Sequence, residues 1–132
     1  MKNKKIILVM EDEEALRGVL CDKIKAQGFD VLLAKNGEEG LELALKEHPD
    51  LILVDIIMPV MDGFTMLQKL HEDEYGKKIK FIILTNVSEL DEVSKALKIK
   101  ELTNYEPFEY FIKSDIKLEE VVQKIKEKLE AS

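Results

Sequence analysis

The chain has 132 residues, of which 45% are hydrophobic and 36% are charged, a composition that predicts one globular domain over residues 1–132 with a sizeable core. Its formal net charge of −7 argues against direct binding to nucleic acid or to an anionic membrane surface, because both would repel it. The single Cys21 excludes an internal disulfide, and since the sequence shows neither a signal peptide nor a long apolar span, we expect a cytoplasmic protein.

Short apolar runs alternate along the chain with segments of helical spacing. In chain order, the predicted strands are Ile6–Met10, Val31–Ala34, Leu51–Val54, Phe81–Leu84 and Tyr110–Ile112. The predicted helices lie between and after them: one with an apolar stripe from Leu16 to Ile24 that ends before Gly28, one that begins at Asn36, one after Asp62-Gly63, one that begins at Ser88, and one that begins near Asp115.

This alternation predicts an α/β fold. Strands that alternate with helices are joined by right-handed crossovers and form a parallel sheet covered on both faces. The strands are apolar throughout rather than at every second position, as expected for strands buried on both sides. With five strands and five helices, we expect the doubly wound, flavodoxin-like three-layer sandwich with strand order 2-1-3-4-5, in which ligands bind where the first and third strands end.

Three carboxylates are expected at that place. Glu11 and Asp12 follow the first strand, and Asp55 ends the apolar third strand. Close carboxylates repel one another and raise each other's pKa unless a cation intervenes, and an all-oxygen ligand set favours a hard ion, Mg²⁺ rather than Ca²⁺. The alternative is that Glu11–Glu14 are merely favourable acids in the first turn of a helix, but this does not explain Asp55.

Two further polar residues follow the fourth and fifth strands. Thr85 and Lys113 should open onto the same crevice, and each alone has an ordinary reading, as a β-branched strand residue and as a solvated lysine. Together with a metal beside Asp55, a hydroxyl and an ammonium form a suitable setting for a phosphoryl group, in which Asp55 is the nucleophile.

At this point the chain resembles the receiver domains of two-component response regulators, the CheY-like superfamily, over nearly its whole length. The matching segments are Ile7–Glu13, Asp55–Gly63, Ile83–Thr85 and Tyr110–Lys113, of which Asp55–Gly63 is the most specific. The resemblance implies a single receiver domain, a phosphoprotein in a phosphorelay, which catalyses only its own phosphorylation and dephosphorylation and is not otherwise an enzyme.

The resemblance also assigns roles to individual residues. Asp55 would accept a phosphoryl group from a histidine kinase or a phosphotransfer protein. Mg²⁺, with Mn²⁺ as an alternative, would be held by Glu11, Asp12, Asp55 and the backbone carbonyl of Ile57. Thr85 and Lys113 would contact the phosphoryl group, and Tyr110 would change rotamer together with Thr85. No other cofactor is implied.

The implied output is a change of surface shape. It would act on a downstream protein partner or on a fused output domain, and a homodimer could form through the face of the fourth helix, fifth strand and fifth helix. The segment Lys98–Glu109 before that strand is longer than is usual in the family, and its Tyr105 and Phe108 either form a docking ridge or pack over the core.

Three positions depart from the family pattern. Ser114 stands where a cis-proline usually follows the lysine, so we expect either a trans bond with a reshaped loop or a strained exception. Asn86 stands where a small residue is usual, and its side chain could either partly cover the site or form a hydrogen bond to the phosphoryl group. Ile57 and Val87, two residues beyond Asp55 and Thr85, are apolar and should exclude water, which predicts a long-lived acyl phosphate.

Three other functions remain open at this stage. A phosphohydrolase with an aspartyl nucleophile would need a second Asp where Ile57 stands, because turnover requires a proton carrier. A flavin carrier of this fold would need a phosphate-binding loop after the first strand, where Glu11–Glu14 would repel phosphate. A receiver-like docking module that no longer takes phosphate is the third, although all the main site residues are present.

Overall fold

The structure is a computed structural model that describes residues 4–86, 88 and 109–130. The strands are β1 (Ile6–Met10), β2 (Asp30–Ala34), β3 (Leu51–Asp55), β4 (Lys80–Thr85) and β5 (Tyr110–Ile112). The helices are α1 (Glu14–Ala26), α2 (Gly37–Glu47), α3 (Gly63–His71) and α5 (Leu118–Glu130), with short 3₁₀ turns η1 (Gly76–Lys78) and η3 (Lys113–Asp115). Within these ranges, no helix combines the length and the apolar character needed to cross a membrane.

The predicted elements are confirmed wherever the structure describes them. Each predicted strand lies within an observed one, and four of the five predicted helices are present. The predicted fourth helix and the segment Lys98–Glu109, with Tyr105 and Phe108, lie outside the described residues apart from Ser88 and Glu109.

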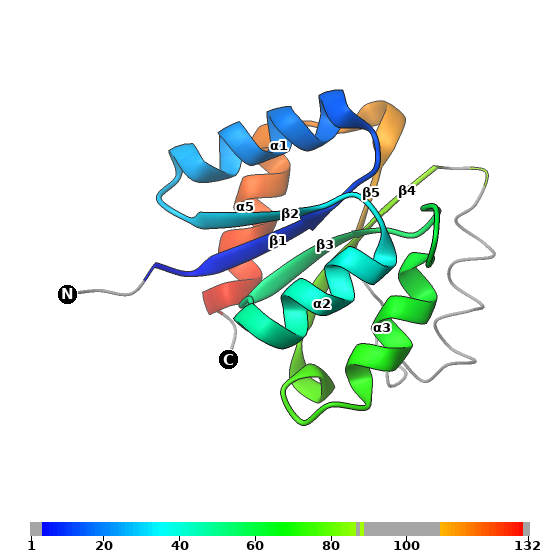
Figure 1. Cartoon of the computed structure of the whole chain (residues 1–132). Coiled ribbons are helices and arrows are strands. Elements are labelled where there is room, and N and C mark those ends of the chain that lie inside the picture. Colours follow the sequence, from blue (N-terminus) through cyan, green and yellow to red (C-terminus); the bar gives the residue numbers. More distant parts are fainter. Residues whose placement is uncertain (1–3, 87, 89–108, 131–132) are drawn as a thin grey trace.

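All five strands form one parallel sheet in the order β2-β1-β3-β4-β5, as the sequence predicts. The order reverses at β1, which lies between β2 and β3, so that the chain winds first to one side and then to the other (Figure 1). Strand β3 is buried at every position, because it lies in the middle of the sheet and is covered on both faces.

Two apolar layers fill the space between the sheet and the helices. Helices α2 and α3 cover one face and α1 and α5 cover the other (Figure 1). The first layer contains Met10, Ala44, Val54, Met66 and Leu70, among others. The second contains Val9, Leu20, Ile24, Val121 and Ile125, among others. The protein is therefore the predicted three-layer sandwich in the part of the chain that is described.

Polar side chains at the first residues of the helices either cap the helix or remain free to make other contacts. Asn36 caps α2 by accepting a hydrogen bond from the Glu39 N–H at 2.8 Å, and Asp62 caps α3 in the same way from Thr65 at 2.8 Å. At the start of α1, by contrast, the side chain of Glu13 makes no capping hydrogen bond. Its carboxylate can therefore act elsewhere.

Two glycines allow the loop after β3 to pack closely. The N–H of Gly37 donates to the Met61 carbonyl at 2.9 Å, and the N–H of Gly63 donates to the Ile56 carbonyl at 2.9 Å. A methyl group at Gly37 would overlap the backbone of Met61, and one at Gly63 would lie 2.8 Å from the Asp55 carbonyl oxygen. The loop that follows Asp55 is thus held against α2 and the end of β3.

A pair of glycine substitutions tests this packing. We expect Gly37→Ala to lower the free energy of unfolding by about 1–3 kcal/mol, because the new methyl group meets backbone that cannot move away cheaply. Gly18→Ala is the matched control, since nothing lies within 4 Å of a methyl group there and the residue is inside α1. It should raise stability by about 0.5–1 kcal/mol. Chemical denaturation measures both, and equal effects of the two substitutions would contradict the close approach at Gly37.

Candidate active site

The polar residues predicted from the sequence meet at the carboxyl ends of the strands. Met10 of β1 pairs with Val54 of β3, so that the next residues, Glu11 and Asp55, lie side by side. Strand β4 lies between β3 and β5, and Lys113, the residue after β5, reaches across the end of β4 to Asp55. Residues far apart in the sequence therefore share one crevice, because parallel strands all end at the same edge.

Three carboxylates form an oxygen cluster there. Glu11, Asp12 and Asp55 each offer one oxygen, and these oxygens lie within 4.8 Å of one another. Glu11 is fully buried and Asp55 is 2% exposed, whereas Asp12 is exposed to solvent. Glu11 Oε1 is buried and has no hydrogen-bond partner among the described residues, an arrangement that is costly for a carboxylate unless a ligand satisfies the oxygen. The donor set, oxygen alone, fits a hard divalent cation such as Mg²⁺.

The ammonium group of Lys113 is the centre of the site's charges. Its Nζ lies 3.1 Å from Glu11 Oε2, 3.2 Å from Asp55 Oδ2 and 3.3 Å from Glu13 Oε1. The lysine side chain is 10% exposed and those of Glu11 and Asp55 are 0% and 3% exposed, so these two ion pairs are poorly screened by water, whereas Glu13 is 64% exposed. A single cation thus faces three carboxylates, and the local excess of negative charge is what a bound metal would relieve.

Burial and these neighbouring charges shift the pKa values of Asp55 and Lys113. Burial, followed by the charge of Glu11, raises the pKa of Asp55 to about 8, although Lys113 acts in the opposite direction. Burial also disfavours the charged lysine, but Asp55 and Glu11 outweigh it and raise the pKa of Lys113 above its ordinary value. Asp55 therefore keeps its proton to an unusually high pH, whereas Lys113 stays charged.

Backbone contacts fix the two acidic segments. Arg17 Nη1 donates to the carbonyl oxygens of Glu11 at 3.0 Å and Asp12 at 3.3 Å, and the N–H of Ile57 donates to Asp55 Oδ1 at 3.2 Å. The sequence reasoning missed Arg17. The available signal was that the chain's one arginine stands about a turn into the helix that follows the acids, within reach of their carbonyls.

Thr85 and Tyr110 occupy different environments. Thr85 is 1% exposed, and its hydroxyl donates to the Asn86 carbonyl at 3.3 Å. Tyr110 pairs with Ile83 in the sheet and is 43% exposed. Val87, which the sequence placed beside the site, lies outside the described residues.

The loop after Lys113 resolves the two alternatives left open for Ser114. No cis peptide bond occurs in the described part of the chain, so the bond between Lys113 and Ser114 is trans. Residues Lys113–Asp115 form the 3₁₀ turn η3 that leads into α5. A trans bond therefore follows the lysine that reaches Asp55, and the strained cis alternative is not adopted.

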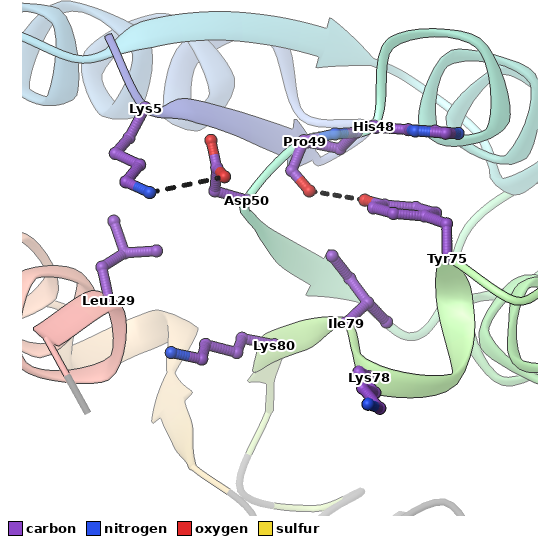
Figure 2. Close-up of a pocket in the computed structure, with 9 residues that line it drawn as sticks. All are labelled: Lys5, His48, Pro49, Asp50, Tyr75, Lys78, Ile79, Lys80 and Leu129. Atoms are coloured by element: carbon purple, nitrogen blue, oxygen red, sulfur yellow. Dashed lines mark hydrogen bonds and ion pairs between the residues drawn. The ribbon is translucent and has the colours of Figure 1, made fainter. Parts of the chain in front are cut away.

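A separate cavity of about 370 Å³ opens at the opposite, amino-terminal ends of the strands (Figure 2). The rings of His48 and Tyr75 stack there, with 4.3 Å between their centroids and 7° between their planes. The Tyr75 hydroxyl donates to the Pro49 carbonyl at 2.5 Å. The ammonium nitrogen of Lys5 lies 3.9 Å from Asp50 Oδ1. These contacts fasten loops together, and none of the predicted site residues lines this cavity.

Comparison with known proteins identifies a family match across most of the chain. Residues 7–126 match the model of the response regulator receiver domain. Sporulation initiation phosphotransferase F of Bacillus subtilis is 33% identical over 110 residues, which are 83% of this chain and 86% of that protein. A probable transcriptional regulator, ycf27, of Porphyridium aerugineum is 33% identical over 96 residues, or 73% of this chain. The matched part is only 39% of that regulator's length.

A solved structure shows the same fold. The receiver domain of the sensor histidine kinase PA1611 from Pseudomonas aeruginosa, with a magnesium ion coordinated in its active site cleft, aligns with a TM-score of 0.81. The alignment covers 98% of this chain and all of that domain, at 24% sequence identity.

The raised pKa of Asp55 predicts a pH-dependent stability. The folded protein holds a proton on Asp55 up to about pH 8, whereas the unfolded chain loses it near the ordinary aspartate pKa of 3.8. Because the folded state binds more protons between these values, the free energy of unfolding should fall as pH rises through this window when divalent cations are chelated. Asp55→Asn should remove this component and be the more stable protein at pH 8. Thermal unfolding at several pH values, with and without Mg²⁺, measures it, and parallel pH profiles for both proteins would contradict it.

Proposed function

The chain belongs to the response regulator receiver domain family, and from this membership we propose that Asp55 is the residue that accepts the phosphoryl group. The donor would be a phosphohistidine on a histidine kinase or on a phosphotransfer protein. The observation that carries the proposal is the position of Asp55: a buried carboxylate at the end of β3, 3.2 Å from the ammonium of Lys113 and beside Glu11 and Asp12.

We propose that Glu11, Asp12 and Asp55 together hold Mg²⁺, with Mn²⁺ as an alternative. The orphaned oxygen of Glu11 and the excess of carboxylates over cations support this, as does the magnesium ion in the cleft of the Pseudomonas aeruginosa domain. When bound, the ion would keep Asp55 ionised and neutralise charge on the transferring group. The Ile57 carbonyl remains the predicted fourth protein ligand.

The phosphoryl step requires little rearrangement of the chain. An oxygen of ionised Asp55 attacks phosphorus, the bond from phosphorus to the donor's imidazole nitrogen breaks, and its electron pair stays on that nitrogen. Lys113 is placed to donate to a phosphoryl oxygen, because its Nζ already lies beside the attacking carboxylate. Thr85 can donate to another only when its hydroxyl leaves the Asn86 carbonyl, so the product changes the partner of Thr85.

The output would be a change in the protein's interaction surface. We propose that the new partner of Thr85 is matched by a rotamer change of Tyr110, which lies on the adjacent strand β5 and is partly exposed. The responding partner is a separate protein, a fused output domain or a second copy that binds through the predicted fourth helix together with β5 and α5. We further propose a cytoplasmic location, which fits the single Cys21 and the histidine kinase donor.

The residue at position 57 argues against a phosphohydrolase. Ile57 stands where that class needs a second carboxylate, and its side chain is 58% exposed at the rim of the site. An apolar side chain there cannot carry a proton or orient a water molecule. The chain is accordingly a receiver domain rather than a conventional enzyme.

Direct labelling tests the acceptor. We expect the intact protein to gain the mass of one phosphoryl group when incubated with acetyl phosphate and Mg²⁺, and Asp55→Asn to gain none, since the amide is not a nucleophile. Asp30→Asn removes an exposed carboxylate at the amino-terminal end of β2 and serves as the matched control that should be labelled normally. Labelling of Asp55→Asn at the rate of the intact protein would place the acceptor elsewhere, and no labelling of any form would refute the proposal.

The exposed Ile57 predicts a slow loss of the phosphoryl group. We expect Ile57→Asn to shorten the lifetime of the phosphorylated protein several-fold, because an amide can orient the attacking water that isoleucine excludes. Val60→Asn is the matched control, because it adds the same polar group to the same loop. Its position is 74% exposed and has a φ of 69°, which asparagine tolerates. The decay of radiolabel after removal of the donor is the measurement. Equal decay for Ile57→Asn and the unaltered protein would show that Ile57 does not protect the bond.

A further inference from the structure

We propose that Glu13 restrains the phosphorylation of Asp55 by occupying the ammonium group of Lys113 that a phosphoryl oxygen needs. Glu13 would thus be a positioning residue that sets how fast small anionic phosphodonors react. This inference rests on the proposed function and adds to it a residue to which the comparison with known families assigns no role.

The argument starts from the number of donors on Lys113. An ammonium group has three N–H bonds. In the structure three carboxylate oxygens surround it, those of Glu11 at 3.1 Å, Asp55 at 3.2 Å and Glu13 at 3.3 Å. Two of its N–H bonds donate to Glu11 and Asp55, and the carboxylate of Glu13 forms an ion pair beside the remaining one, so an incoming phosphoryl oxygen must compete with a carboxylate for Lys113.

The surroundings of the three carboxylates decide which one leaves. The side chain of Glu11 is 0% exposed, so releasing it strands a buried charge, which is costly. The side chain of Asp55 is 3% exposed and must stay beside Lys113, because it is the group that reacts. The side chain of Glu13 is 64% exposed and can be hydrated as soon as it turns away. Glu13 is thus the partner that the phosphoryl group displaces.

The backbone of Glu13 allows this exchange without a change of fold. Its N–H donates to Glu11 Oε2 at 3.0 Å, and its carbonyl accepts the first hydrogen bond of α1, from the Arg17 N–H at 2.9 Å. Its side chain has no capping role at the helix start. Only side-chain torsions need to change, and the carboxylate can swing between Lys113 and water.

The exposed position of Glu13 adds a second, electrostatic effect. Acetyl phosphate is an anion, and a carboxylate at the mouth of the site repels it before any bond changes. Removing the charge of Glu13 should therefore favour both the approach of the donor and the availability of Lys113. The reaction itself stays the same: an Asp55 oxygen bonds to phosphorus and acetate leaves with the electrons of the broken P–O bond.

The test compares Glu13→Gln with Glu14→Gln in the full chain. Glu14 is the neighbouring exposed acid in the first turn of α1 and is not among the partners of Lys113 in the described part of the chain, so both variants change the net charge equally. We expect Glu13→Gln to raise the rate constant for labelling by acetyl phosphate about two- to fivefold, as the loss of a largely exposed ion pair allows, and Glu14→Gln to change it much less. Beryllofluoride binding, followed by NMR, should tighten for Glu13→Gln by a similar factor and gives a readout that does not depend on turnover.

The outcomes separate this inference from the proposed function. If the unaltered protein is labelled but Glu13→Gln reacts no faster than Glu14→Gln, or reacts more slowly, Glu13 does not restrain Lys113 and the inference is wrong while Asp55 remains the acceptor. If both variants are faster by the same factor, the effect is one of net charge alone and the inference is likewise wrong. If no form of the protein is labelled, the proposed function itself fails.

Discussion

The constraint on which the site depends is the burial of two carboxylates, Glu11 and Asp55, beside a single ammonium group. Lys113 pairs with both, yet Asp55 still has its pKa raised to about 8, which shows that one cation does not balance the site. Replacing buried charged groups by well-packed apolar residues is often neutral or stabilising for a protein. The end of the central strand therefore carries more negative than positive charge. A bound cation or a phosphoryl group changes this balance and can thereby change the contacts of Lys113.

Parallel topology places these charges together, and the loop after β3 keeps them in place. The order β2-β1-β3 makes β1 and β3 neighbours, which puts Glu11 next to Asp55 although their residue numbers differ by 44. Gly63 then returns the chain so closely to the end of β3 that a side chain there would press on the Asp55 backbone. Between them Val60 has a φ of 69°, a conformation that costs a β-branched residue energy and that persists because both ends of the loop are fastened.

The sequence predicts the sheet and the acidic site well for a definite physical reason. Continuous apolar strands allow only burial on both faces, and parallel strands bring their carboxyl ends together, so Asp55, Thr85 and Lys113 could be assigned to one crevice from position alone. The partners of Lys113 could not be assigned. That Glu13 rather than Glu14 reaches Lys113, and that Arg17 holds the carbonyls of the acidic segment, depends on where α1 begins and on side-chain rotamers. Element ends and rotamers are set by tertiary contacts, which periodicity does not encode.

The same geometry indicates where a change at Lys113 can be transmitted. Lys113 follows β5 directly and opens η3, which leads to α5, so a new partner for its ammonium acts on the backbone between them. Helix α5 is held to α1 by Lys23 and Glu119 at 3.3 Å and to the end of α1 by Lys126 and Gln27 at 2.8 Å. Strand β5 is different: unlike the other four strands, it contains no fully buried residue. An element with little buried surface moves more readily than a well-packed one, because less packing energy is lost when it shifts. We therefore expect a displacement that starts at Lys113 to move β5 before it moves the well-packed pair of α1 and α5.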